Sequence, residues 1–277
     1  MPTQLEKSHA FRALHKRPGA FVIPNPWDAG TAKLLSSIGF EALATTSLGL
    51  ANMLGNANVS ADEILGNCRA IVEATDLPVS ADLENCGADA PDAAAHMIRL
   101  AWATGVVGGS IEDATGNPAN PIYPFELAVD RVRAAVEMAR SLPVPFVLTA
   151  RADNLICGRN DLGDTIRRLQ AFEEAGADVL YAPGLQDLET IRIVVSSVRK
   201  PLNVVMSKAD KTLTVADLTA VGVKRISIGG MMSQLALATV LEAATDMKQE
   251  GTFSIFRAAT PAAELRTHFA AGTRTRD

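Results

Sequence analysis

Charged side chains recur in this sequence where short apolar segments end. Asp82 and Glu84 lie at the end of one such segment, Glu112 closes the next, and Arg151 closes a third. Alternate residues of a strand point to the same side, so Asp82 and Glu84 are expected to face together. Carboxylates that are brought together repel one another unless a cation or a proton compensates them. The pattern therefore predicts a site at which several carboxylates share a cation.

The residue types available at these segment ends limit which cation fits. All four histidines fall in predicted helices: His9, His15, His96 and His268. The three cysteines are widely spaced and form no C-x-x-C pair: Cys68, Cys86 and Cys157. A zinc site is therefore disfavoured, and the remaining oxygen ligands suit Mg²⁺, with Mn²⁺ as the alternative. The cysteine pattern also favours a reducing, cytoplasmic compartment.

Other polar residues at the segment ends have two interpretations. Asp28 and Asp153 can be metal or substrate ligands, but an aspartate before a helix is equally a common N-cap. Asn203, in the segment 202–206, is a further candidate substrate contact.

The elements that must position these residues alternate along the chain. Eight short apolar or β-branched segments are separated by stretches with helical periodicity. The candidate strands are Phe21–Pro24, Glu41–Thr46, Pro78–Leu83, Val107–Glu112, Pro145–Arg151, Asp178–Ala182, Leu202–Met206 and Arg225–Ile228. Eight such units in about 250 residues predict an α/β fold, a (β/α)8 TIM barrel, whose reactive groups lie where strands end. An open doubly wound sheet is the alternative, but the first strand is not followed by its glycine fingerprint.

The repeat continues without a linker, which predicts a single domain over residues 1–277. The barrel is expected over about 18–248, with an extra N-terminal helix before it and a C-terminal helical extension over about 254–277. Ser233–Lys248 and Thr260–Ala271 are predicted to be the last barrel helix and an additional helix. Their apolar residues can pack on the barrel or on a neighbouring subunit.

Composition excludes several classes of protein. The chain has 277 residues and a net charge of −5, so it has no basic surplus for binding nucleic acid. Its 48% hydrophobic and 21% charged residues are typical of a globular protein rather than a disordered one. No apolar run approaches the roughly 18–20 residues that span a membrane, and the polar N-terminus does not resemble a secretory signal.

Several segments together carry a resemblance to a known family. They are PNPWDAGTAKLLSSIGFEAL, TTSLGLANMLG, SADLENCG, GGSIEDATG, LTARADN and EAGADVLYAPG. Their order and content resemble the isocitrate lyase/phosphoenolpyruvate mutase family over about Pro18–Lys248.

The resemblance implies roles for the residues at the segment ends. Asp82 matches the direct metal ligand of the family, and Glu84 and Glu112 match residues that hold the metal through water. Ser47, with the amides of Leu48 and Gly49, matches a loop that binds the substrate carboxylate and its 2-oxo oxygen. Arg151 matches the arginine that reaches the substrate.

The sequence also departs from this family. Its lyases carry a Lys-Lys/Arg-Cys-Gly-His loop, whereas this chain has ATGNPANPIYP, which contains neither Lys nor Cys. Asn117 in this stretch instead matches the asparagine-bearing gate of the mutase and phosphonopyruvate hydrolase branch, and so becomes a candidate catalytic residue. Asn58 stands where the family has an aspartate, and Pro183 stands where relatives have His or Glu.

These observations predict a Mg²⁺-dependent enzyme that cleaves a C–C or C–P bond beside a 2-oxo acid through an enolate intermediate. A decarboxylase or hydrolase is expected rather than a true isocitrate lyase. A 2-oxo acid-binding protein without catalytic activity is the first alternative, and a Schiff-base aldolase using Lys208 is the second. The resemblance further implies a homodimer or homotetramer that exchanges its last barrel helix.

Overall fold

Eight parallel strands form the centre of the computed structural model, which describes residues 2–207 and 213–272. The strands are β1 (Phe21–Ile23), β2 (Leu43–Ala44), β3 (Val79–Asp82), β4 (Gly108–Glu112), β5 (Val147–Arg151), β6 (Val179–Tyr181), β7 (Leu202–Val205) and β8 (Arg225–Ser227). Each of the eight predicted strands is present at its expected place in the chain.

The strand order confirms the barrel and shows that the open-sheet alternative is wrong. Strand β1 pairs in parallel with β8, and the order continues from β8 through β7 and the intervening strands to β2. The gap between β2 and β1 is bridged by the amide of Ala44, which donates to the carbonyl oxygen of Pro24 at 3.0 Å. The sheet therefore closes on itself, and the carboxyl ends of all eight strands meet at one end of the barrel.

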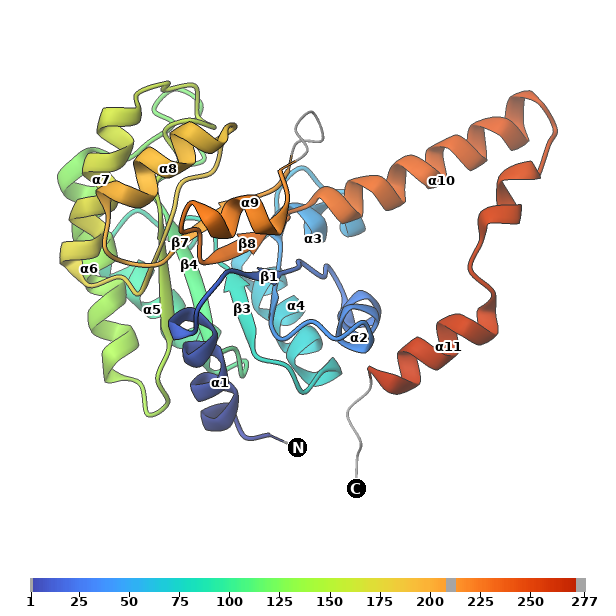
Figure 1. The fold of residues 1–277 in the computed structure, drawn as a ribbon, viewed down its shortest axis with the longest axis horizontal. Coiled ribbons are helices and arrows are strands. Elements are labelled where there is room, and N and C mark those ends of the chain that lie inside the picture. Colours follow the sequence, from blue (N-terminus) through green and yellow to red (C-terminus); the bar gives the residue numbers. More distant parts are fainter. Residues whose placement is uncertain (1, 208–212, 273–277) are drawn as a thin grey trace.

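Helices follow the strands and cover the barrel (Figure 1). They are α2 (Ala29–Ser37), α3 (Ser47–Leu54), α4 (Ala61–Ala74), α5 (Pro91–Trp102), α6 (Phe125–Ser141), α7 (Leu162–Ala175), α8 (Leu188–Ser197) and α9 (Val215–Ala220). Local signals set their starts. In α4, for example, Ser60 accepts from the amide of Glu63 while the Glu63 carboxylate accepts from that of Ser60, which satisfies two otherwise free donors.

The amino-terminal end of the barrel is closed by helix α1 (Gln4–Lys16). Phe11 and Leu14 of this helix pack with Phe21, Val147 and Val179 in one apolar cluster. This end of the barrel is therefore apolar, whereas the interior nearer the carboxyl ends of the strands carries polar side chains.

The last part of the chain departs from the barrel. Helix α10 (Met231–Gln249) extends outward, and the short 3₁₀ helix η1 (Ser254–Ala258) and helix α11 (Ala262–Ala271) lead back toward α2 (Figure 1). Ser37 of α2 and His268 of α11 lie 2.9 Å apart, Oγ to Nδ1. Both predicted C-terminal helices are thus present. No helix within residues 2–207 or 213–272 combines the length and apolar character that crossing a membrane requires.

Candidate active site

Asp82 at the end of β3 is held by the start of helix α3. Its Oδ2 accepts hydrogen bonds from the amide of Ser47 at 3.0 Å and from the Ser47 hydroxyl at 2.9 Å. Its Oδ1 accepts a longer bond, 3.3 Å, from Ser110 of β4. The two residues that the sequence assigned to metal and substrate are therefore in direct contact.

The segment that begins at Ser47 is a helix rather than the loop expected from the sequence. Thr46 is its N-cap and accepts a hydrogen bond from the amide of Gly49 at 3.2 Å. The amides of Ser47 and Gly49 are thus engaged by Asp82 and Thr46. Leu48, the second residue of the helix, is exposed. Amides in the first turn of a helix favour anions, so the predicted carboxylate grip lies at a suitable place.

Arg151 at the end of β5 lies between two carboxylates. Its Nη1 is 3.0 Å from Oε2 of Glu112, and its Nε is 2.5 Å from Oδ1 of Asp153. Its guanidinium also lies over the Tyr181 ring, 5.1 Å from the centroid. Glu112 and Asp153 therefore fix the arginine that the sequence assigned to the substrate.

The carboxylates of this group influence one another. Burial raises the pKa of Glu112 well above its usual value, and the charges of Asp153, Asp82 and Glu84 raise it further, while Arg151 opposes them. Burial and the charge of Asp82 likewise raise the pKa of Glu84. Acidic groups that perturb each other in this way are typical of functional sites.

Glu84 lies near these carboxylates, but its position does not come from the alternation of side chains along a strand. Strand β3 ends at Asp82, and Glu84 lies in the following turn with a φ of +50°. The premise that Asp82 and Glu84 share one face of a strand was therefore wrong. The left-handed backbone of Glu84 is uncommon for a residue other than glycine, and its carboxyl is nevertheless within electrostatic reach of Asp82.

A cavity of about 80 Å³ opens beside these residues in the mouth of the barrel. Most of its lining residues are of polar type, among them Asp82, Arg151, Tyr181, Asn203, Ser110 and Arg225. Ser47, Glu84 and Glu112 do not line it. Asn203 is buried and donates to the Ser227 hydroxyl at 3.0 Å. Asn203 thus lines the same cavity as Asp82 and Arg151, and its contact with a substrate stays a prediction.

Other candidate residues lie elsewhere. Asn117 is exposed, and its side chain accepts a hydrogen bond from the amide of Ala119 in its own loop. Asn58 is exposed and Pro183 is buried. Asp28 caps α2 by accepting from the amide of Thr31. Lys208 falls outside the described residues.

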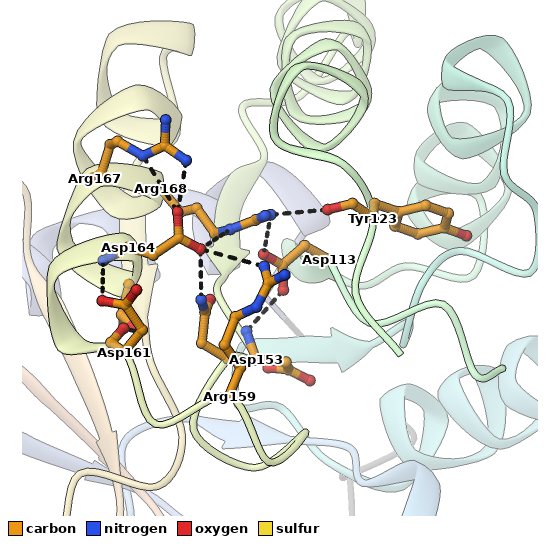
Figure 2. A network of polar contacts seen from close by, with 10 residues as sticks. Asp113, Tyr123, Asp153, Arg159, Asp161, Asp164, Arg167 and Arg168 are labelled. Atoms are coloured by element: carbon orange, nitrogen blue, oxygen red, sulfur yellow. Dashed lines mark hydrogen bonds and ion pairs between the residues drawn. The ribbon is translucent and has the colours of Figure 1, made fainter. Parts of the chain in front are cut away.

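A buried network behind the site joins the segments that follow β4 and β5 (Figure 2). Asp113 accepts hydrogen bonds from the amide of Asp153 at 2.7 Å and from Arg168 at 3.0 Å. Arg168 also donates to the carbonyl oxygen of Tyr123 and to Asp164. Asp113 is 2% exposed. It holds the backbone of Asp153, which is the ion-pair partner of Arg151. Asp113 directly follows the predicted strand Val107–Glu112, and nothing local in the sequence reveals its partner in α7.

The donors present suit a hard cation that keeps most of its water. Among the described residues, no group of three His, Cys, Asp or Glu side chains is arranged to hold an ion directly. Mg²⁺ is commonly held by one or two carboxylates and several waters. The negatively charged side chains of this site are all carboxylates. The carboxylates of this site therefore fit a Mg²⁺ ion that keeps most of its water.

A closed parallel barrel with acidic side chains and an arginine at the carboxyl ends of its strands has the arrangement of an enzyme active site in this fold. The chain belongs to the phosphoenolpyruvate phosphomutase family, whose model matches residues 11–248. This places it in the isocitrate lyase/phosphoenolpyruvate mutase superfamily, as the sequence motifs indicated. The superfamily comprises lyases, mutases and hydrolases that act on 2-oxo acid substrates.

Individual relatives cover most of the chain. The crystal structure of a candidate lyase/mutase from Burkholderia cenocepacia J2315 is 53% identical, with a TM-score of 0.94 and 96% of each chain covered. The 2-methylisocitrate lyase of Escherichia coli (strain K12) is 31% identical over 206 residues, which cover 70% of this chain and 67% of the lyase. The oxaloacetate decarboxylase of Chromohalobacter salexigens is 25% identical, with 85% of this chain and 83% of the decarboxylase covered.

Proposed function

We propose that this protein is a Mg²⁺-dependent enzyme that cleaves a C–C or C–P bond beside a 2-oxo acid through an enolate intermediate. The observation that carries the proposal is the group of mutually perturbed carboxylates around Arg151 at the carboxyl ends of β3, β4 and β5. The relatives that are a 2-methylisocitrate lyase and an oxaloacetate decarboxylase support the substrate class. Buried, unpaired Cys68 and Cys86 agree with a reducing cytoplasm.

Three carboxylates would hold the ion. Asp82 would be the direct ligand, and Glu84 and Glu112 would hold its waters, as the family resemblance implies. When bound, a divalent ion supplies positive charge where negative charge develops on the 2-oxo oxygen. The amide of Ser47 fixes Asp82 in place for this role.

The substrate is positioned by the start of α3 and by Arg151. The Ser47 hydroxyl and the amides of Leu48 and Gly49 bind the substrate carboxylate. For this the Ser47 hydroxyl gives up its bond to Asp82 and the Gly49 amide gives up its bond to Thr46. Arg151, held by its two carboxylate partners, orients the bound acid. The loop that contains Asn117 closes over it. Loss of CO₂ from oxaloacetate needs no protein base for the bond-breaking step, so oxaloacetate is the first substrate to test.

A substrate panel tests the proposal. The protein is incubated with Mg²⁺ and oxaloacetate, phosphonopyruvate or 2-methylmalate-type acids, and pyruvate release is followed by lactate dehydrogenase and NADH. Reactions with Mg²⁺ alone correct for spontaneous decarboxylation. We expect pyruvate from at least one acid, loss of release with EDTA and recovery with excess Mg²⁺. If none of the acids released pyruvate while bound Mg²⁺ was verified, catalysis would be contradicted.

Asp82→Asn tests the metal ligand. The substitution keeps the shape of the side chain but removes the charge that holds the ion, so we expect kcat/KM to fall by roughly a thousandfold. Asp92→Asn is the matched control, because Asp92 is exposed in the first turn of α5, and it should retain full activity. Equal activity of D82N and the wild type would contradict the assignment of Asp82.

A 2-oxo acid-binding protein without turnover is the second candidate. It is favoured by the position of Pro183, whose buried ring cannot transfer a proton, and by Asn117, whose side chain is bonded within its own loop. Titration with oxalate in the presence of Mg²⁺ separates the two functions. Tight binding without turnover of the whole panel would identify a binding protein.

A further inference from the structure

Arg225, the first residue of β8, is a buried cation in the interior of the barrel. It is 6% exposed, and its Nε donates to Oδ1 of Asn203 at 2.8 Å. Its Nη1 is buried and has no hydrogen-bond partner. Within residues 2–207 and 213–272, no carboxylate forms an ion pair with it. The guanidinium thus retains an unused donor and an uncompensated charge.

Two ionisable groups close to Arg225, Tyr181 and His15, are neutral at pH 7. Burial raises the pKa of Tyr181 to about 12, so its hydroxyl keeps its proton at pH 7. Burial and the nearby charge of Arg225 lower the pKa of His15, on α1, to about 3, so this imidazole is uncharged. Burial also lowers the pKa of Arg225 itself, to about 10, and the guanidinium therefore remains charged at pH 7.

A buried charge without a partner opposes folding. Removing an ion from water costs free energy, and neutral neighbours do not offset that cost. A protein with an apolar residue of similar size at such a position is often at least as stable. Residues that lower the stability of the fold in this way are expected at functional sites. The buried Arg131 of α6 also has one donor without a partner, Nε, but its other donors contact the carbonyl oxygens of Asn85, Ala88 and Asp89.

Arg225 and Arg151 line the same cavity, but they differ in what they can offer an incoming anion. The donors of Arg151 already contact Glu112 at 3.0 Å and Asp153 at 2.5 Å. Arg225 contacts one amide oxygen and has a free Nη1. Among the described residues that line this cavity, Arg225 is therefore the arginine without a carboxylate partner.

We propose that Arg225 is a second anion-binding residue of the site, and that its guanidinium receives a carboxylate of the small acid that enters the cavity. The inference rests on the proposed function and deepens it. A volume of about 80 Å³ admits a carboxylate group or a few waters, so the ligand is a short carboxylic acid rather than a larger molecule. A charge-assisted contact with the guanidinium compensates the buried charge.

Two substitutions at this position and one control test the proposal. Arg225→Met removes the charge at similar volume, and Arg225→Lys keeps it. Arg192→Met removes the same charge from exposed α8, where Arg192 pairs with Glu189 at 2.9 Å. Oxalate binding with Mg²⁺ is measured by calorimetry on the full chain, and Tm is measured without ligand.

We expect R225M to weaken oxalate binding at least tenfold while its Tm equals or exceeds that of the wild type. R225K should weaken binding less, and R192M should bind oxalate within twofold of the wild type. Wild-type affinity in R225M would overturn the role of Arg225, as would a Tm lowered by several degrees in both R225M and R225K, because that result identifies a structural role. A wild-type protein that binds no oxalate and releases no pyruvate would instead overturn the proposed function itself.

Discussion

Gly49, in the first turn of α3, has no space for a side chain. A Cβ at this position would lie 2.5 Å from Cγ2 of Thr46 and 3.0 Å from Cβ of Trp27. Gly49→Ala must therefore displace the start of the helix, whose first residue, Ser47, holds Asp82. We expect the free energy of unfolding to fall by about 1–3 kcal/mol and oxalate binding to weaken at least tenfold. Urea unfolding and calorimetry measure the two effects.

Gly66 provides the matched control within another helix. It is exposed in α4, and a Cβ added there would meet no atom within 4 Å. Gly66→Ala should raise the free energy of unfolding by roughly 0.5–1 kcal/mol, because alanine loses less backbone entropy than glycine in a helix. Oxalate binding should stay unchanged. If G49A were stabilised as much as G66A, the close packing at the start of α3 would be contradicted.

Individual residues also show where sequence reasoning succeeds. The positions of Asp82, Glu112 and Arg151 follow from the ends of apolar segments, because parallel strands bring their carboxyl ends together. The turn that carries Glu84 could not be predicted, since its left-handed backbone is unusual for glutamate. Arg225 was missed because a charged residue at the start of a strand usually marks the surface, and nothing local reveals that its side chain is buried.

At the scale of elements, Asp164 of α7 joins helix and loop behind the site (Figure 2). Its carboxylate accepts hydrogen bonds from Arg167 at 2.6 Å, Arg168 at 2.9 Å and Asn154 at 2.8 Å. Burial acts to raise the pKa of Asp164, but these hydrogen bonds outweigh it and hold the pKa well below its usual value. The ionised carboxylate therefore stabilises the fold at neutral pH.

Asp164→Asn should lower the free energy of unfolding by about 3 kcal/mol at pH 7, because it leaves buried Arg168 with one carboxylate partner, Asp113. A carboxyl whose pKa is depressed by folding contributes stability above its unfolded value, near 4, and loses it as the pH falls further. The difference between D164N and the wild type should therefore shrink between pH 5 and pH 2.5. Urea unfolding across this range measures it.

Asp130 is the control for the network. It pairs with Arg133 at 2.5 Å on exposed α6, where both side chains are more than half exposed. Exposed pairs of this kind contribute little, so Asp130→Asn should change the free energy of unfolding by less than about 0.5 kcal/mol. If D130N and D164N were equally destabilised, the network would have no special role in joining α7 to the segment after β4.

At the scale of the whole molecule, α10 is the element whose place sequence reasoning left open. Its periodicity predicted a helix but not what it packs on, because an apolar face is the same whether a barrel or a second subunit covers it. In α10, Ser233 is the one buried residue. Leu235, Val240 and Leu241 are 69%, 61% and 68% exposed, and the helix extends away from the barrel (Figure 1). Contiguous apolar exposure of this kind marks an association surface.

A second copy of this chain is the partner that we expect on α10. Further exposed apolar side chains, Met53 and Leu54, lie at the end of α3. Asn52 of this helix contacts Ser233 near the start of α10, so exposed apolar side chains lie on two helices that touch. Light scattering should give a multiple of the 29.2 kDa chain mass. Leu241→Glu should weaken self-association at least tenfold, because a carboxylate would be buried against apolar groups. Gln249→Glu adds the same charge at the polar end of the helix and should leave the assembly intact. A wild-type mass of 29.2 kDa at micromolar concentration would contradict the partner.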